Sequence, residues 1–450
     1  MSFLTKLMLI ACCQSFTFGS QQEGRLMEDL FKDYNSRARP VHNVTNAVQL
    51  VFDIALKQIL DVDERNQIIT TNVWVRQYWS DEFLRWNTSQ YGGITAIRVD
   101  ATSIWRPDLR LYNTAQENFK GIDIESKTKA TIYSDGSVVW LSPHVLKSVC
   151  KMDITYFPFD DQYCVMVFAS WAYHGTHVNI TNKLPAGDLS SYSASGEFQL
   201  LSFNVERKVK RYDCCPEPYP ELTYTLHLRR RARFFLMNTI VPSTLISFLA
   251  FLSFSLPPDS GERIGLVITT LLSLAVFMMI ISDQIPPTSE VFPLLQKFLT
   301  AVMFEIGFAL MANCVVISWA SREGPPSPFL KKILNFQFFK KALKDRNNVK
   351  ITSVNGEGDK GTGQANNGYQ KESNQRNPAK KENENDWERK VLKHLQIISE
   401  SKAVKKKQQA YKDEWKLAGA TLDRLCIVLF LVTIVATLGF VFDAAPRITL

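Results

Sequence analysis

Four long apolar runs constrain this chain more than any other feature of its sequence. They cover residues 234–256, 264–281, 298–319 and 425–442, and their only charged residue is Glu305 in the third. A helix of about 20 apolar residues spans the hydrocarbon core of a bilayer, and among spanning structures only helices and closed barrels satisfy every backbone polar group there. We therefore predict four transmembrane helices rather than the buried helices of a large soluble domain. We place these helices at residues 234–256, 262–283, 291–319 and 418–442.

The N-terminus is typical of a secretory signal peptide, with a lysine, a short apolar run and small residues at Gly19 and Ser20. We assign residues 1–20 to this signal, which places the following segment outside the cell in an oxidising compartment. With four spans, residues 443–450 are then an extracellular C-terminus and residues 320–417 a cytoplasmic loop.

The cytoplasmic loop holds the excess positive charge of the chain. It carries 22 Lys or Arg against 12 Asp or Glu, whereas the rest of the chain carries 30 against 32. This distribution follows the positive-inside rule and does not indicate nucleic-acid binding. Within the loop, residues 327–343 fit an amphipathic helix on the membrane surface. Residues 347–385 have the composition of a disordered segment, and residues 386–416 have a charged helical pattern.

The region before the first span, residues 21–233, is soluble in character. A short helix is expected at residues 24–35, and Asp135-Gly136 is a hairpin signal. Strand-like alternation recurs at residues 48–59, 68–79, 129–134, 138–141, 164–171, 199–209 and 222–229. Many short strands with turn signals predict an extracellular immunoglobulin-like β-sandwich of about ten strands, followed by an all-α four-helix transmembrane bundle. Three sequons predict N-glycosylation at Asn43, Asn87 and Asn179.

The cysteines separate by location. Two leave with the signal peptide, and Cys314 and Cys426 lie in apolar runs, where we expect buried thiols. Four remain, which allow three pairings: Cys150, Cys164, Cys214 and Cys215. Neighbouring Cα atoms are ~3.8 Å apart, below the usual disulfide range of about 4.4–6.8 Å, so a bond between the adjacent pair would be an unusual staple.

The second apolar span carries a stripe of distinctive residues on one helical face. Steps of three and four place these residues together, with an acid at each end and bulky apolar residues between: Glu262, Gly265, Thr269, Leu272, Val276, Ile280 and Asp283. Around a central axis, the acids would form cation-selecting rings and the apolar residues constrictions that close by dewetting. The alternative is that the stripe packs against other spans. Glu305 is likewise either functional or an internally paired group.

The stretch CKMDITYFPFDDQYC, residues 150–164, resembles the signature loop of the pentameric ligand-gated ion channels, the Cys-loop receptors. The resemblance covers nearly the whole mature chain. Adjacent Cys214 and Cys215 make it similar to an α-type subunit of the nicotinic acetylcholine receptors, in wording nearest to the α-nine/α-ten branch. The resemblance implies disulfides Cys150–Cys164 and Cys214–Cys215 and assembly with other subunits as a homo- or heteropentamer in the plasma membrane, including postsynaptic membranes.

The resemblance also implies an agonist site between subunits. Its principal face would comprise Tyr112, Trp171, Tyr212, Cys214, Cys215 and Tyr219, and its complementary face Trp74, Thr131, Val139 and Leu141. Acetylcholine carries a quaternary ammonium, which an aromatic cage holds by cation–π attraction. Each aromatic side chain alone could equally be sandwich core.

Further positions follow for gating and permeation. The resemblance implies a coupling arginine at Arg230 with Glu64 as its ion-pair partner. It also places the link between the second and third spans, through Pro286, against a loop formed by Phe157, Pro158, Phe159 and Asp160. The implied permeant ions are sodium and potassium, with calcium as a further candidate. No cofactor and no enzymatic motif is expected.

Several positions depart from the family pattern. Val167 stands where many relatives carry a lysine near Tyr212, and Gly265 where a pore hydroxyl is usual. Thr131 and Val139 make a complementary face that is not standard. His174 and His177 lie beside Trp171, but without a third ligand we favour ordinary loop residues over a metal site.

The sequence therefore predicts an acetylcholine-gated, cation-selective channel subunit. Two alternatives remain at this level. One is a subunit that works only beside other subunits or responds to another amine. The other is a non-conducting ligand-binding or scaffold protein, which the acidic ends of the second span disfavour.

Overall fold

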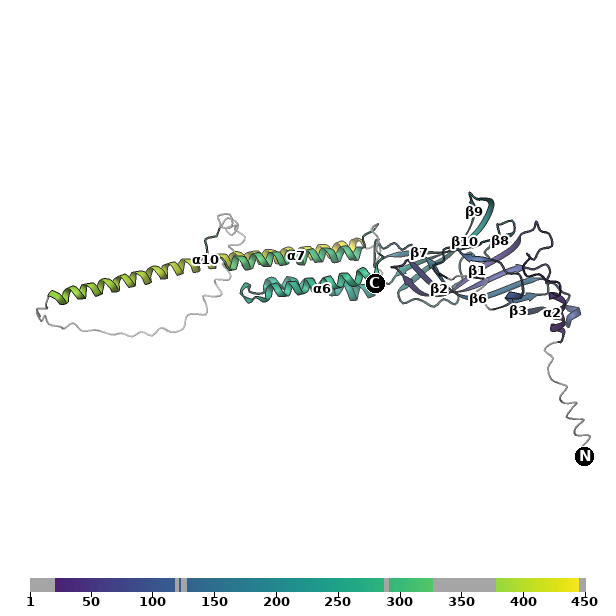
Figure 1. Ribbon diagram of the computed structural model, residues 1–450, viewed down its shortest axis with the longest axis horizontal. Helices are drawn as coiled ribbons and strands as arrows, with labels where there is room; N and C mark the ends of the chain where they lie inside the picture. Colours follow the sequence, from purple (N-terminus) through teal and green to yellow (C-terminus); the bar gives the residue numbers. More distant parts are fainter. Residues whose placement is uncertain (1–20, 118–120, 123–127, 287–290, 327–377, 445–450) are drawn as a thin grey trace, which may run out of the picture. The chain divides into compact units, whose positions relative to one another are not determined.

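The structure is a computed structural model that describes residues 21–117, 121–122, 128–286, 291–326 and 378–444 (Figure 1). The predicted signal peptide, the predicted amphipathic helix at 327–343 and most of the segment 347–385 lie outside these residues. The chain divides into two compact units, each described by itself below. The first comprises the chain up to Met237, residues 279–297 and the end of the chain from Phe442, and the second comprises residues 238–278 and 298–441.

The first unit is a two-sheet β-domain that follows helix α2 (Gln21–Phe31). One sheet has the strand order β3-β5-β6-β2-β1-β8 and the other β4-β7-β10-β9. The strands are β1 (Val48–Asp63), β2 (Ile68–Ser80), β3 (Ala96–Asp100), β4 (Leu109–Leu111), β5 (Lys129–Tyr133), β6 (Ser137–Val149), β7 (Asp161–Ser170), β8 (Val178–Thr181), β9 (Phe198–Tyr212) and β10 (Cys215–Arg230). Short 3-10 turns occur at η1 (Thr88–Tyr91) and η2 (Ala101–Ser103). The predicted sandwich and its strand number are confirmed.

Alternating side chains explain why these segments pair as sheets. Along β6 every second residue is buried, including Val138, Trp140 and Leu146. Because successive strand residues point to opposite faces, this period of two gives the sheet one inner and one outer face. The strand continues to Val149, well beyond residue 141, where the predicted strand ended. Pro143 weakens the strand signal in the sequence, because proline cannot donate a hydrogen bond to the sheet.

The second unit is helical. Helix α5 (Val241–Leu252) follows α4 (Arg233–Phe235) and the π-helical segment η3 (Leu236–Ile240). Two 3-10 turns, η4 (Ser253–Ser255) and η5 (Pro258–Ser260), lead to α6 (Glu262–Gln284), and then come α7 (Leu294–Ala320) and α10 (Pro378–Ala444). Within the described residues, four helical stretches are long and apolar enough to cross a membrane: Arg233–Ser255, Glu262–Gln284, Leu294–Ala320 and Arg389–Ala444.

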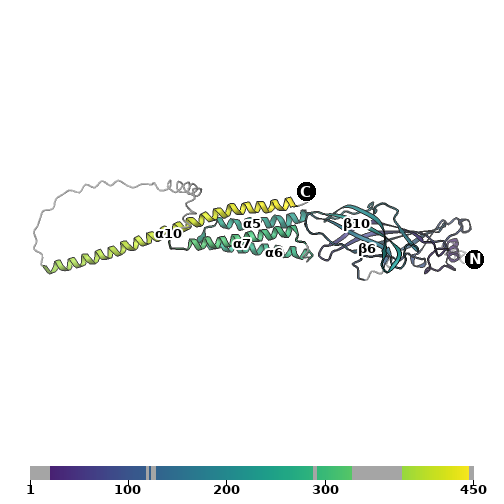
Figure 2. The same ribbon diagram turned by 90° about the horizontal axis from the view of Figure 1, so that it is seen from above.

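The predicted fourth span is part of a single helix of 67 residues (Figure 2). Residues 378–385, which we predicted to be disordered, belong to its first turns, so that part of the prediction is wrong. The segment is rich in Lys and Glu, which are good helix formers. Its polar composition led to the prediction of disorder, although polar residues of this kind also form helices.

A buried guanidinium joins the helices of the second unit. Arg263 at the start of α6 is fully buried. It donates to both carboxylate oxygens of Asp423 on α10 and to Asn313 Oδ1 on α7, and it lies 5.5 Å from the ring centroid of Phe254. A charge in a low-dielectric interior needs such partners, so this cluster fixes one end of the helix packing.

Glu305, the acid within the third span, is paired inside the bundle. Thr437 Oγ1 donates to its Oε1 at 2.9 Å. The other carboxylate oxygen, Oε2, is buried and has no hydrogen-bond partner within the described part of the chain. One of the two carboxylate oxygens of Glu305 is therefore paired within the bundle, as the second of the two alternatives expects.

Candidate functional site

The four predicted principal-face aromatics form two contacting pairs on the four-stranded sheet. Tyr112 follows β4 and Trp171 follows β7, and their rings meet edge to face with centroids 5.7 Å apart. Tyr212 ends β9 and Tyr219 lies in β10, with centroids 5.5 Å apart, also edge to face. The structure thus brings together residues that are up to 107 positions apart, from 112 to 219, on one sheet.

Asp108 positions the tryptophan of this group. Its Oδ2 accepts a hydrogen bond from the backbone N–H of Ala172 at 2.7 Å, and its Oδ1 accepts from the hydroxyl of Ser170. These bonds fix the backbone on both sides of Trp171. The indole itself is 71% exposed, so it is free to contact a ligand or a neighbouring chain.

The hydroxyl of Tyr112 is a hydrogen-bond donor within this group. It donates to the carbonyl of Ser170 at 2.8 Å. Burial raises the pKa of Tyr112 to about 12, and the neighbouring Tyr212, Asp108 and Glu221 add to this effect. The phenol therefore remains a neutral hydrogen-bond donor at physiological pH.

The tip of the β9–β10 hairpin carries the adjacent cysteines. Their Sγ atoms lie 2.7 Å apart and both are free thiols in the structure. The disulfide implied for Cys214 and Cys215 is thus not formed here, in keeping with the short Cα separation of neighbouring residues. The sulfurs are close enough that the bond remains a prediction.

The four predicted complementary-face residues share the outer face of the six-stranded sheet. Leu141 of β6 lies opposite Arg76 of β2, which is two residues from Trp74. Val139 lies opposite Thr131 of β5. Because the alternation on each strand has a period of two, Trp74, Leu141, Val139 and Thr131 point the same way. They face away from the other sheet, so they do not join the principal-face aromatics of their own chain.

The paired histidines stand beside the second aromatic pair. The ring centroids of His174 and His177 are 4.1 Å apart, and that of His174 is 6.3 Å from Tyr219. Burial and the neighbouring His174 and Arg39 lower the pKa of His177. No cluster of three or more His, Cys, Asp or Glu able to hold a metal ion occurs in the described part of the chain.

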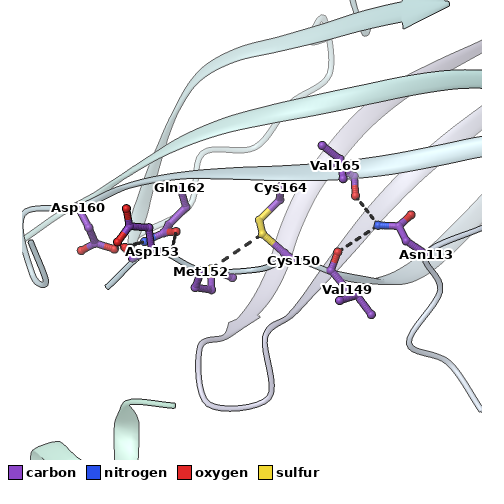
Figure 3. Close-up of a disulfide and its surroundings, with 9 residues drawn as sticks. All are labelled: Asn113, Val149, Cys150, Met152, Asp153, Asp160, Gln162, Cys164 and Val165. Atoms are coloured by element: carbon purple, nitrogen blue, oxygen red, sulfur yellow. Dashed lines mark hydrogen bonds between the residues drawn. A yellow bond between two sulfur atoms is a disulfide. The ribbon is translucent and has the colours of Figure 1, made fainter. Parts of the chain in front are cut away.

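The signature loop is closed by the disulfide Cys150–Cys164, with Cα atoms 4.9 Å apart (Figure 3). Asn113 donates to the carbonyls of Val149 and Val165, the residues that precede and follow the two half-cystines, at 3.0 and 2.8 Å. Gln162 Nε2 donates to the carbonyl of Asp153 at 2.7 Å, within the loop. These bonds fix the loop at both ends and across its middle.

Arg230, at the end of β10, is the centre of a buried charge cluster. Its side chain is 4% exposed, and Nη1 lies 2.5 Å from Glu64 Oε1, the predicted partner. Nε and Nη2 lie 2.8 and 3.2 Å from the two oxygens of Asp160. The guanidinium carbon also lies 4.8 Å from the ring centroid of Phe157. Two carboxylates and an aromatic ring thus hold one guanidinium.

The start of α7 contacts the signature loop. The backbone N–H groups of Leu294 and Leu295 donate to the carbonyls of Thr155 and Phe157, each at 3.1 Å. Pro286 is buried, but these hydrogen bonds come from the first two residues of α7, so its contact with the loop stays a prediction. A cavity of about 690 Å³ lies beside Arg230, and its walls include Glu64, Phe157, Phe235 and Asp283.

The predicted stripe of α6 is exposed along its whole length. All seven residues from Glu262 to Asp283 are exposed, with Leu272 at 65%. The opposite face is buried and comprises Arg263, Val267, Thr270, Leu274 and Ile281. Packing against helices of the same chain therefore does not use the stripe.

Comparison with known proteins now decides the family. Residues 23–232 match the neurotransmitter-gated ion-channel ligand-binding domain, and residues 239–441 match the corresponding transmembrane region. The chain belongs to the neurotransmitter-gated ion-channel family. The members of this family are receptor subunits of ion channels and not enzymes. With its four candidate spans, the chain is a multi-pass plasma-membrane protein with an extracellular ligand-binding domain.

Among curated proteins the chain is similar to acetylcholine receptor α subunits. The acetylcholine receptor subunit alpha-type acr-16 of Caenorhabditis elegans is 42% identical over 318 residues, covering 71% of this chain and 63% of that protein. The neuronal acetylcholine receptor subunit alpha-3 of Homo sapiens is 41% identical over 312 residues, covering 69% and 61%. Subunit alpha-9 of Homo sapiens is 39% identical over 321 residues, covering 71% and 66%. The match thus spans somewhat less than two thirds of the length of each relative.

Sequence reasoning missed several residues that build these sites. Asp108 and Asn113 hydrogen-bond to the chain beside Trp171 and beside the half-cystines, and Glu221 pairs with a lysine next to Tyr219. In the sequence, only their positions close to the motifs could have indicated these roles. Lys210 was missed because its role depends on strand register. Its Nζ lies 2.9 Å from Glu221 Oε1, across the β9–β10 pair.

Proposed function

We propose that this chain is a subunit of an acetylcholine-gated, cation-selective channel that assembles as a pentamer. The observation that carries the proposal is the pairing of Tyr112 with Trp171 and of Tyr212 with Tyr219 beside an exposed indole face. Trp171 and Tyr212 are exposed and Tyr112 and Tyr219 are half-buried, so none of these four rings is part of the buried sandwich core.

The proposed ligand follows from the chemistry of these rings. A quaternary ammonium has no N–H to donate, so its recognition depends on the negative faces of aromatic rings, each worth ~0.5–2 kcal/mol according to desolvation. Trp171 is the strongest candidate because indole gives the largest cation–π attraction. The relatives named above are acetylcholine receptor subunits, which makes acetylcholine the first ligand to test.

The two predicted faces would meet between subunits. Trp74, Thr131, Val139 and Leu141 lie on the outer face of the six-stranded sheet, where they cannot reach the principal face of their own chain. In a ring of subunits this outer face would cover the principal-face aromatics of the neighbour. Because one chain carries both faces, either a homopentamer or a heteropentamer can be built this way.

The Arg230 cluster would couple the agonist site to the pore. Arg230 ends β10, the strand that also carries Tyr219. Asp160 and Phe157 connect it to the signature loop, and that loop accepts hydrogen bonds from the first two residues of α7. A movement of the β9–β10 hairpin on agonist binding would therefore reach the start of α7, which the chain joins directly to α6. Gating requires that the agonist bind the open-favouring state more tightly than the closed state.

The exposed stripe of α6 would line the ion pathway. Glu262 and Asp283 would form acidic rings that attract sodium, potassium and calcium, and Leu272, Val276 and Ile280 would form the apolar constriction that closes the pore. Lipid would then contact the other spans, whose exposed side chains are mostly apolar.

Expression of the full chain alone in oocytes under voltage clamp tests this function. We expect acetylcholine to evoke an inward current carried by sodium, and Trp171→Ala to abolish it at the same surface expression. A chain that reaches the surface and gives no current in the presence of acetylcholine would contradict the homomeric form of the proposal. Co-expression with another receptor α subunit then decides whether the chain works only in heteromers.

A further inference from the structure

The complementary-face tryptophan is already in contact with a cation of its own chain. Lys57 Nζ lies 4.2 Å from the ring centroid of Trp74. This is the distance at which an ammonium gains cation–π attraction from an indole face. Trp74 is 42% exposed, so the remainder of the ring is open to solvent or to a neighbouring subunit.

The register of β1 with β2 places Lys57 on this face. Ala55 lies opposite Trp74, and Lys57, two residues further along β1, points to the same side of the sheet. Lys57 is also the extra residue of a β-bulge, because Leu56 lies opposite Val73 and Gln58 lies opposite Asn72. The backbone is held there, since the carbonyl of Lys57 accepts from the N–H of Ser193 at 2.8 Å.

The charge of Lys57 is not neutralised by a neighbouring acid. Within the described residues no carboxylate lies in ion-pair distance of its ammonium. The acid nearest in register, Asp188, bridges to β1 at Ala55 and is already paired with Arg76 at 2.6 Å. Backbone and side-chain hydrogen bonds from Ser190, together with Arg76, lower the pKa of Asp188, so it stays an occupied anion.

We propose that Lys57 is a tethered cation that competes with the agonist ammonium for Trp74. This inference rests on the proposed function and concerns the specificity of the same site. An agonist site to which this chain contributes the complementary face holds a quaternary ammonium more weakly than its aromatic residues alone would allow. The chain therefore forms its tighter sites when it supplies the principal face and another subunit, with a neutral residue at the position of Lys57, supplies the complementary face.

Three variants of the full chain in oocytes test the competition through the acetylcholine EC50. Lys57→Met removes the charge at similar length, and we expect the EC50 to fall about two- to thirtyfold, the range of one cation–π contact. Lys57→Arg keeps a cation and should stay near wild type. Lys32→Met removes an exposed lysine just after α2 and controls for net charge. An unchanged or higher EC50 in Lys57→Met overturns the proposal.

Charge and shape are separated by a cysteine at the same position. In Lys57→Cys, a methanethiosulfonate that attaches an aminoethyl group should raise the EC50 again, whereas one that attaches a neutral methyl group should not. Wild-type receptors treated with both reagents control for reaction at Cys214 and Cys215. Equal effects of the two reagents would show that bulk rather than charge acts at this position.

A labelling measurement keeps this inference distinct from the proposed function. In the purified full-length receptor, the rate of reductive methylation of Lys57, followed by mass spectrometry, should rise severalfold in Trp74→Ala and on addition of tetramethylammonium. If no variant gives a current but labelling of Lys57 rises in Trp74→Ala and with tetramethylammonium, the channel proposal fails and the contact between Lys57 and Trp74 is supported. If labelling of Lys57 is the same in all conditions, the tethered cation is wrong whatever the currents show.

Discussion

Lys210 on β9 pairs with Glu221 on β10, with Nζ 2.9 Å from Oε1. The carboxylate is 3% exposed, whereas the lysine side chain is about half exposed. The hydrogen bond from Lys210 therefore stabilises a charge that has little access to water, and Glu221 raises the pKa of Lys210. Val167 on β7 lies opposite Thr223, two residues from Glu221. Many relatives carry a lysine at the position of Val167. In this chain Lys210 of the β9–β10 hairpin provides the cation beside Glu221 instead.

The pair predicts coupled effects on agonist response. Lys210→Met should raise the acetylcholine EC50 more than Glu221→Gln, because it leaves a buried carboxylate unpaired. Since the lysine is half exposed, we expect a coupling energy of only about 1 kcal/mol, or about fivefold in EC50. A double-mutant cycle under voltage clamp measures it. Lys208→Met, beside exposed Glu206 on the same strand, is the control, and additive effects of the two changes would refute the coupling.

Arg230→Gln should uncouple agonist binding from channel opening. The change leaves Asp160 and Glu64 without their cation, and breaking a buried pair costs about 3–5 kcal/mol. We expect at least a tenfold loss of acetylcholine-evoked current, with surface binding of a labelled agonist within about twofold of wild type. The adjacent and exposed Arg231→Gln is the control.

The two acids around Arg230 should differ in weight. Asp160 makes two hydrogen bonds to the guanidinium and its side chain is 2% exposed, whereas Glu64 makes one and is 21% exposed. Asp160→Asn should therefore reduce the evoked current more than Glu64→Gln. The reverse order would place the coupling role on Glu64.

Local motifs account for the part of the site that could be predicted from the sequence. The cysteine spacing of residues 150–164 and the segments around Tyr112, Trp171 and Tyr212 each lie within about fifteen residues, so one sequence window contains them. Strands β1, β2, β7 and β10 were predicted because each is long enough to show alternation. Strands β4 and β8 have three and four residues and show too few periods for that signal. β3 was also missed, whereas β5, which also has five residues, was predicted beside the Asp135-Gly136 turn.

The contacts that could not be predicted depend on register. Lys57 reaches Trp74 because the register of β1 with β2 sets Ala55 opposite Trp74, and Lys57 is the next residue of β1 on that face. Lys210 meets Glu221 only through the pairing of β9 with β10. Asp160 was expected as part of a junction loop, and its bidentate contact with Arg230 becomes visible only once the loop and β10 lie side by side.

Replacement of Glu262 tests the proposed pore. Glu262→Ala should weaken cation selectivity because it removes an acidic ring from the exposed face of α6. Under dilution of external sodium chloride, the reversal potential of the acetylcholine-evoked current should shift toward the chloride equilibrium potential. Glu323→Gln, an acid outside α6 that pairs with Lys412, should leave the reversal potential unchanged. Equal reversal potentials in Glu262→Ala and wild type would remove Glu262 from the ion pathway.

The three sequons should differ in glycan occupancy. Asn43 and Asn87 are exposed, and each side chain only accepts hydrogen bonds from its own sequon. Asn179 lies within β8, donates to Gln49 Oε1 and accepts from Arg207, both at 2.8 Å. A glycan on its Nδ2 would have to displace the bond to Gln49. Intact glycopeptide mass spectrometry should find Asn43 and Asn87 occupied and Asn179 largely unmodified, and high occupancy at Asn179 would contradict this ranking.

His144 predicts a loss of stability in mild acid. The imidazole is buried on the inner face of β6, where it pairs with Ser142 Oγ at 2.9 Å, and burial lowers its pKa from 6.5 to about 4. The unfolded chain therefore binds a proton near pH 6.5 that the folded domain refuses until about pH 4. Stability from this group is complete above pH 6.5 and falls by about 3 kcal/mol as the pH drops to about 4.

His144→Gln keeps a partner for Ser142 and removes the titration. Between about pH 7 and about pH 5, the thermal midpoint of the purified receptor should fall less in His144→Gln than in wild type. His394→Gln, an exposed histidine on α10, should behave as wild type. Parallel pH dependence in His144→Gln and wild type would assign the acid sensitivity to other groups. Asp81 cannot cause this loss of stability in acid. Burial raises the pKa of Asp81, so the folded domain binds its proton at a higher pH than the unfolded chain does, and a fall in pH stabilises the folded state through this group.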